Sequence, residues 1–256
     1  MDKPGHRVYN FRRRCKMNRA EVRELAARYR NEVIAGDVEG ALAALHPLVA
    51  GRTPFPLLDL AGRVIAGAAA ANPTALTALL DGLAATGEMG AWPLIGSALA
   101  AAYLPHDLPR AFAEARRYIL QADVWHATDV VGERVLGEGL RADFDAALPL
   151  LEHWRDEASP WLRRAVGVAV HLYAKRERNR PDRAARLLDL LEPLFEERDT
   201  AALKGVGWGL KTIGRFYPDL LAPWLREQMA GKTPRKLMVR KAVTYLPAEI
   251  KEEFLG

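Results

Sequence analysis

The feature that most constrains the fold of this chain is a helix-capping residue placed directly before a proline, which occurs four times. The pairs are Thr53-Pro54, Asn72-Pro73, Ser159-Pro160 and Thr233-Pro234. Proline lacks an N–H donor and has a preset φ angle, so the first turn of a helix tolerates it best, and the preceding side chain can accept an unpaired N–H there. The pattern predicts a chain of many helices.

Apolar residues between these positions recur at helical spacing, as in Leu203, Val206, Leu210 and Ile213. Alternating strand patterns bounded by turns are hard to find. We expect helices over residues 19–35, 38–49, 54–71, 73–86, 89–104, 107–122, 124–138, 143–157, 160–177, 182–197, 200–216, 218–230 and 234–246. The expected fold class is therefore all-α.

The expected helices form pairs of about 35 to 40 residues with short connections, a period typical of stacked HEAT or armadillo repeats. This favours a curved α-solenoid of HEAT-like antiparallel helix pairs over an irregular all-α domain. Residues 1–16 contain Pro4, Gly5 and the run Arg12 to Arg14 without helical periodicity. We expect 1–16 to be a flexible basic extension and 17–256 to be a single domain.

Composition narrows the classes of protein that the chain can belong to. Half of its 256 residues are hydrophobic, but no apolar run approaches the roughly 20 residues that cross a bilayer, so we expect no membrane span. No apolar stretch follows the Arg-rich N-terminus, which leaves the cytoplasm as the expected location. Cys15 is the only cysteine and excludes an internal disulfide. The net charge of +5 favours an anionic partner.

The sequence also lacks the motifs of several enzyme classes. Its histidines are scattered without ligand spacing, and there is no Walker-type loop, no G-x-G-x-x-G and no nucleophile elbow. We expect no metal and no cofactor.

Two expected helices carry a basic stripe apart from their apolar face. In residues 200–216 the stripe is Lys204, Trp208, Lys211 and Arg215, and in residues 160–177 it is Arg164, His171 and Lys175, continued by Arg178. A tryptophan among cations suits a polyanion, and arginine commonly grips phosphate with its planar fork. The alternatives are a half-buried tryptophan under lysine stems and a merely solvated face.

Trp125 and Asp129 are four residues apart, so they lie side by side on one helix. A carboxylate beside an indole can stabilise a transient cation. The alternative is a surface aspartate next to a core tryptophan.

Three segments, taken in order, resemble the signature segments of the AlkD-like DNA alkylation-repair glycosylases. They are residues 124–129 (VWHATD), 159–165 (SPWLRRA) and 202–211 (ALKGVGWGLK). In that family the first segment carries a Trp and an Asp four apart, the second a W-L-x-R stretch and the third a K-A-I-G-W-x-L-R stretch. Gly205 stands where the family has alanine, and residues 237–242 (LMVRKA) are more loosely similar to its basic C-terminal segment.

The resemblance covers about residues 19–246 and implies a set of functional residues. Carried over by position, the active site would be Trp125, Asp129, Arg164 and Trp208. The basic stripes and the C-terminal basic segment add the expected DNA-binding residues, which are Lys175, Lys204, Lys211, Arg215, Arg240 and Lys241. We expect a monomer that binds duplex DNA containing alkylated bases in the concave face of its helix stack.

The implied reaction is hydrolysis of the N-glycosidic bond of cationic purines such as N3-alkyladenine and N7-alkylguanine, without metal or nucleotide. Asp129 would stabilise the oxocarbenium-like sugar and place a water, Trp125 and Trp208 would pack on the deoxyribose, and Arg164 would hold phosphate. On this view Asp129→Asn removes most base excision and leaves folding and duplex binding nearly intact. Two other readings stay open: a non-catalytic DNA-binding protein and a protein-binding solenoid scaffold.

Overall fold

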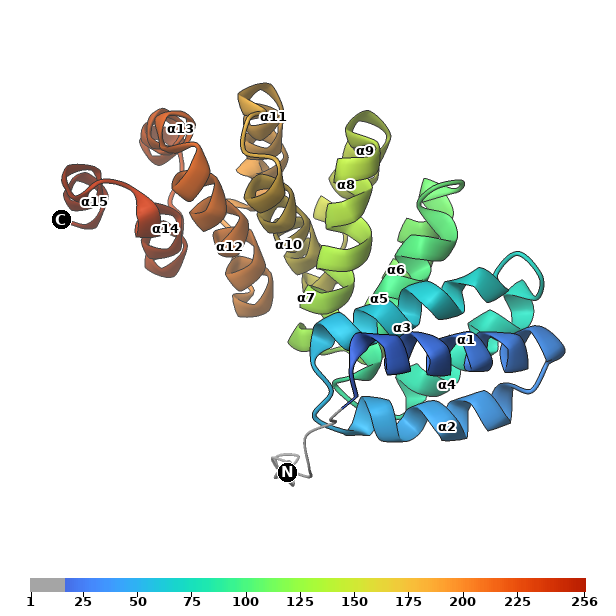
Figure 1. The fold of residues 1–256 in the computed structure, drawn as a ribbon. Helices are drawn as coiled ribbons and strands as arrows, with labels where there is room; N and C mark the ends of the chain where they lie inside the picture. Colours follow the sequence, from blue (N-terminus) through green and yellow to red (C-terminus); the bar gives the residue numbers. More distant parts are fainter. Residues whose placement is uncertain (1–16) are drawn as a thin grey trace, which may run out of the picture. The chain divides into compact units, whose positions relative to one another are not determined.

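The computed structural model describes residues 17–256, which fold into helices joined by short connections (Figure 1). No strand occurs within these residues, so the all-α prediction is confirmed. The expected basic extension, residues 1–16 with Cys15, lies outside the described residues. The chain divides into two compact units, the first ending at Leu94 and the second beginning at Ile95. The expectation of a single domain over 17–256 stays a prediction.

The first unit contains two packed pairs of helices. Its elements are α1 (Arg19–Ala35), α2 (Val38–Ala50), α3 (Phe55–Ile65), the 3-10 turn η1 (Ala66–Ala68), α4 (Pro73–Ala85) and the start of α5 (Ala91–Tyr103). Helix α1 packs on α3, and α2 packs on α4. Asn18 starts α1 with a complete capping box to Glu21, and Gly36 ends it at a φ of 89°, a conformation that suits glycine.

The second unit continues from α5 to the end of the chain. Its elements are α6 (Leu108–Ala122), α7 (Trp125–Val131), the π-helical segment η2 (Gly132–Gly137), α8 (Glu138–Ala142), α9 (Phe144–Arg155), α10 (Pro160–Arg176), α11 (Pro181–Leu191), η3 (Glu192–Leu194), α12 (Thr200–Phe216), α13 (Pro218–Gly231), α14 (Lys236–Ala242), η4 (Val243–Tyr245) and α15 (Ala248–Leu255).

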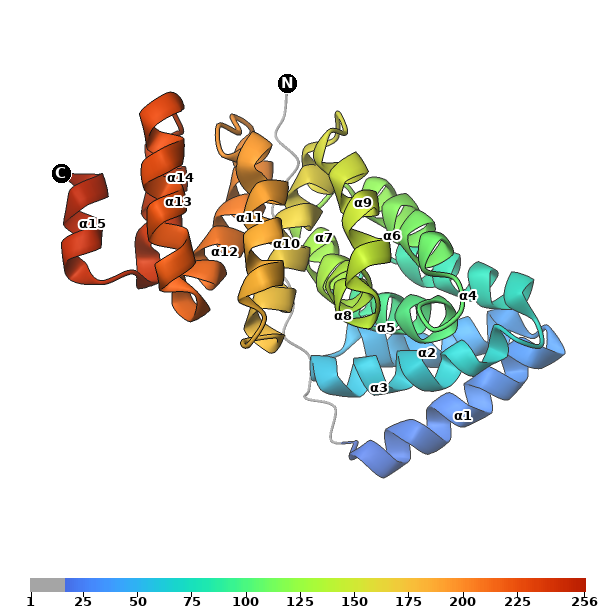
Figure 2. The ribbon, with the colours of Figure 1, turned by 90° about the horizontal axis from the view of Figure 1, so that it is seen from above.

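These helices pack in two rows (Figures 1 and 2). One row contains α6, α9, α11 and α13, each packed on the next. In the other row α10 lies between α7 with η2 on one side and α12 on the other, and α12 also packs on α14. The core between the rows includes Phe112, Phe144, Tyr173 and Phe195, all nearly inaccessible to solvent. Every residue of the predicted site falls in the second row.

The predicted helix starts are mostly right, but not every residue before a proline forms the expected capping bond. Asn72 accepts the Ala75 N–H as expected. Thr53 instead donates its hydroxyl to the carbonyl of Leu48, and Ser159 precedes α10 without a capping bond. Helix α14 begins two residues after Pro234, at Lys236.

The lengths of three predicted helices also need correction. The helix over 54–71 ends at Ile65 and tightens into η1, and the helix over 182–197 ends at Leu191, because Pro193 cannot donate the next helical bond. The helix beginning at Trp125 continues through η2 as far as Ala142, beyond the predicted end at residue 138. In the described part of the chain, no helix combines the length and the apolar character needed to cross a bilayer.

Candidate functional site

An ion pair between Asp129 on α7 and Arg164 on α10 forms the centre of the candidate site. Arg164 donates from Nε to Oδ1 and from Nη2 to Oδ2 of Asp129, both at 2.7 Å. Its Nη1 donates to the carbonyl oxygen of Ala201 on α12 at 2.9 Å. The exposed fractions of the two side chains are 8% for Arg164 and 14% for Asp129. One guanidinium therefore connects three helices from a position that solvent barely reaches.

This contact requires α10 and α12 to approach closely, and glycines allow that. A Cβ atom on Gly205 would lie 2.4 Å from the carbonyl oxygen of Arg164, and one on Gly167 would lie 2.3 Å from the backbone of Gly205. Moving either backbone to make room for a Cβ atom would disturb the packing of the two helices. Gly205, which departs from the alanine of the family pattern, thus sits where the two helices meet.

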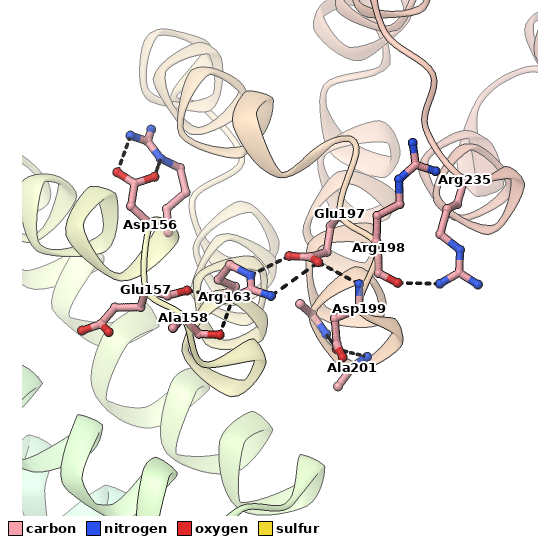
Figure 3. Close-up of polar contacts among 11 residues, drawn as sticks. Asp156, Glu157, Ala158, Arg163, Glu197, Arg198, Asp199, Ala201 and Arg235 are labelled. Carbon is pink, nitrogen blue, oxygen red and sulfur yellow. Dashed lines mark hydrogen bonds and ion pairs between the residues drawn. The ribbon is translucent and has the colours of Figure 1, made fainter.

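Polar contacts at the ends of these helices hold their spacing (Figure 3). Arg163 donates to the carbonyls of Glu157 and Ala158 before α10, and its Nε donates to Glu197 at 2.6 Å. Glu197 in turn accepts the N–H of Asp199, whose side chain caps α12. The first turns of α10 and α12, which carry Arg164 and Ala201, are therefore fixed to each other.

Trp125 opens α7 one turn before Asp129, and 55% of its surface is exposed. Its ring meets His126 edge to face, with 5.6 Å between centroids. Burial lowers the pKa of His126 against the opposing effect of Asp129, which favours a neutral ring beside the indole. The alternative of a surface aspartate beside a core tryptophan is wrong, because the Asp129 side chain is mostly shielded from solvent and the indole is the exposed partner.

Trp208 lies on the face of α12 that turns toward α10. Its indole stacks on the imidazole of His171, with 3.9 Å between centroids and 24° between planes. His171 is buried, and its Nδ1 lies 2.7 Å from the hydroxyl of Thr212. Desolvation, with the positive charges of Lys175 and Lys211, lowers the pKa of His171 to about 4. The ring contacts of Trp125 and Trp208 are thus with different histidines.

Three predicted DNA-binding residues, Lys175, Lys211 and Arg215, line one cavity of about 290 Å³ at the C-terminal ends of α10 and α12. Arg178 lines it as well, and none of the lining residues is acidic. Arg178 lies over the ring of Phe216, and Arg215 lies over that of Tyr245. The aromatic rings thus hold the two arginines in place, and no carboxylate that lines the cavity neutralises them.

The other three predicted DNA-binding residues lie on α12 and α14. The side chain of Lys241 lies against α12 at Gly207, because a Cβ atom on Gly207 would meet the methylene groups of Lys241. Burial, followed by the charges of Lys211, Arg164 and Lys204, lowers the pKa of Lys241. Lys204 and Arg240 are exposed, on α12 and α14.

The sequence reasoning missed several residues that shape the site. The Ala201 carbonyl could not be found, because it acts through the backbone. The sequence shows only that Thr212 lies one turn after Trp208 and Glu133 one turn after Asp129. Any residue at those positions would have the same spacing, so neither could be identified. Tyr245 follows the basic segment that resembles the family, and an aromatic residue beside clustered cations could have identified it.

The comparisons with known proteins point to one family. A family model described as DNA alkylation repair enzyme matches residues 61–246. The searches of curated proteins and of solved structures returned no match. The matched span covers more than half of the chain and includes every residue of the candidate site, which confirms the resemblance inferred from three short segments. The chain belongs to the DNA alkylation repair enzyme family.

Proposed function

We propose that the protein is a DNA glycosylase that hydrolyses the N-glycosidic bond of cationic alkylated purines, such as N3-alkyladenine and N7-alkylguanine, in duplex DNA. The observation that carries the proposal is the shielded Asp129 carboxylate, held by Arg164 one turn from the exposed indole of Trp125. A repair family whose substrate is alkylated DNA needs a fixed negative charge near the sugar.

The chemistry follows from the charge of the lesion. Alkylation makes the base cationic, so it leaves as a neutral molecule with the electrons of the glycosidic bond, and the deoxyribose becomes oxocarbenium-like. Water then adds to that carbon and gives up a proton, which Asp129 accepts. Stabilising the developing charge in this way is typically worth about 3 to 4 kcal/mol, or roughly 100- to 1,000-fold in rate.

The other site residues have positioning tasks in this proposal. Trp125 and Trp208 pack on the deoxyribose and exclude water from its open face. Arg164 holds Asp129 with two N–H groups and Ala201 with a third, which leaves one N–H on each terminal nitrogen for a neighbouring phosphate. No metal or cofactor takes part.

The binding surface in this proposal is the positive region along α10, α12 and α14. Its cations are Lys175, Lys204, Lys211, Arg215, Arg240 and Lys241. They would hold the backbone of duplex DNA by counterion release, which makes affinity depend steeply on salt. We further propose that the protein acts as a monomer in the cytoplasm.

We also propose that the helices form a HEAT-like α-solenoid with the DNA on its concave face. Many side-chain hydrogen bonds between helices join residues whose separation in the sequence is close to the expected length of one helix pair, about 35 to 40 residues. Examples are Arg164 with Asp129, 35 apart, and Lys232 with the Glu192 carbonyl, 40 apart. Asn72 and the Ile34 carbonyl, within the first unit, are 38 apart. Within each unit, a separation of 35 to 40 residues supports a stack of helix pairs.

The test is to incubate the protein with methylated duplex DNA and measure released 3-methyladenine and 7-methylguanine. We expect release by the parent protein and almost none by Asp129→Asn. The matched control is Asp145→Asn, which removes an exposed aspartate paired with Arg186 and should leave the rate unchanged. Salt-sensitive DNA binding without base release would favour the non-catalytic DNA-binding protein. Failure to bind DNA would favour the protein-binding scaffold.

A further inference from the structure

The contacts of Trp208 form a closed ring through two other side chains. Its indole stacks on His171, Nδ1 of His171 lies 2.7 Å from the Thr212 hydroxyl, and that hydroxyl donates to the Trp208 carbonyl oxygen at 2.9 Å. Because a hydroxyl has one proton, Nδ1–H of the imidazole is then the donor to Thr212. The imidazole plane is fixed from α12, and it supports an indole of the same helix.

The charges around His171 favour the neutral form of its ring. Lys175 on α10 and Lys211 on α12 act on it with positive charge, and burial removes solvent from it, which lowers its pKa to about 4. From η2, Glu133 approaches Nε2 only to 3.7 Å. Within the described chain Nε2 has no hydrogen-bond partner, as expected for a lone pair that no donor reaches. A neutral ring can stack on an indole without adding another charge to this crowded positive region.

We infer that His171 is a positioning residue that holds the Trp208 indole in the orientation needed to pack on the deoxyribose. The inference rests on the proposed function for its effect on rate, but the orientation of the indole can be measured without activity. His171 reaches the site only through Trp208, since one face of the indole lies on the imidazole.

Two substitutions separate the ring from its hydrogen bond. His171→Asn keeps an N–H donor near Thr212 and removes the ring, whereas His171→Phe keeps an aromatic ring and removes the donor. Stacking of two aromatic rings favours the stacked orientation by roughly 3- to 10-fold at equilibrium. A misplaced contact in a reactive complex can slow the reaction by about 100-fold. We expect His171→Asn to slow single-turnover base release by about 10- to 100-fold and His171→Phe, which keeps an aromatic ring under the indole, to slow it by less than about 10-fold.

The second readout is the near-ultraviolet circular dichroism of Trp208, obtained by subtracting the spectrum of Trp208→Phe in each background. We expect His171→Asn to lose this signal while the far-ultraviolet spectrum stays parental. His171→Phe keeps the stacked ring without its hydrogen bond to Thr212, so we expect it to keep a weakened signal. If His171→Asn keeps the parental Trp208 signal, the inference is overturned, whatever its rate. Loss of the signal in His171→Phe to the same extent as in His171→Asn overturns it as well.

Thr212→Val tests the same inference with His171 intact and serves if a His171 variant does not fold. Valine has the shape of threonine and removes only the hydroxyl that fixes the imidazole. We expect a weaker Trp208 signal and a slower rate, and an unchanged signal would contradict the inference. If the parent protein releases no base, the proposed function fails, while the Trp208 signal still decides whether His171 positions the indole.

Discussion

Removing the charge of Asp129 should impair both base excision and stability, because its partner is a buried guanidinium. Arg164 is 7% exposed, and both of its bonds to Asp129 are 2.7 Å long. Stranding one partner of a buried pair typically costs about 3 to 5 kcal/mol. Asparagine can still accept one bond from Arg164, so we expect Asp129→Asn to lower the free energy of unfolding by about 2 to 3 kcal/mol. The expectation that this variant folds nearly as well as the parent needs this correction.

A double-mutant cycle measures the interaction directly. Arg164→Gln alone leaves a buried carboxylate without its cation, whereas the double variant Asp129→Asn/Arg164→Gln leaves two neutral amides that can bond each other. We expect the double variant to be more stable than the sum of the single losses predicts, by about 2 kcal/mol.

The assay is urea unfolding of all four proteins at neutral pH, followed by far-ultraviolet circular dichroism. The exposed pair Asp145–Arg186 is the control, and its cycle should show a much weaker coupling, because solvent screens both charges. Strictly additive losses for Asp129 and Arg164, or an Asp129→Asn variant as stable as the parent, would refute the argument that burial makes this pair interdependent.

Three other changes have expected outcomes. Lys211→Ala should lower the salt slope of DNA binding by about one unit, measured by fluorescence anisotropy, while Lys251→Ala on α15 leaves it unchanged. Gly205→Ala should cost about 1 to 3 kcal/mol in urea unfolding, because its Cβ would lie 2.4 Å from the Arg164 carbonyl, whereas Gly231→Ala meets nothing within 4 Å and should cost nothing. His171, with a pKa of about 4 against an ordinary 6.5, binds a proton in the unfolded chain before the folded one. Stability should therefore fall between pH 6.5 and 4 by up to about 3 kcal/mol, and a thermal-unfolding pH series in which His171→Asn shows the same fall would contradict this.

The helices could be predicted from the sequence because their causes are local. Spacing such as Leu203, Val206, Leu210 and Ile213 places one apolar face on α12, and these four residues are fully buried. Capping was predicted less well, since Thr53 and Ser159 each had a choice of partners. Thr53 donates to the Leu48 carbonyl on the preceding helix, a bond that no local pattern specifies.

The partners of the site residues could not be predicted, because they depend on how successive helices align. The position of Arg164 on the basic stripe predicts a cation that projects toward solvent and phosphate. It is instead buried, and the residue that neutralises it stands 35 positions earlier. That separation is nearly one helix-pair period, so the pairing is set by the offset between neighbouring pairs. The offset depends on glycine contacts such as that of Gly167 with Gly205, which a sequence pattern does not quantify.

The same geometry explains how one region can be strongly basic and still hold a functional carboxylate. Lys175 lies in the last turn of α10 and Arg178 follows just after the helix, while Arg164 lies near its N-terminal end, about 16 Å from Lys175 by helical rise. Arg164 binds Asp129 and the Ala201 carbonyl, which keeps the carboxylate away from the open cluster of cations. A polyanion attracted to the cluster therefore meets the cations at one end of the helix and the fixed negative charge at the other. In the proposed reaction, the cations at the C-terminal end of α10 bind backbone phosphate away from the carboxylate that must stabilise a cationic sugar.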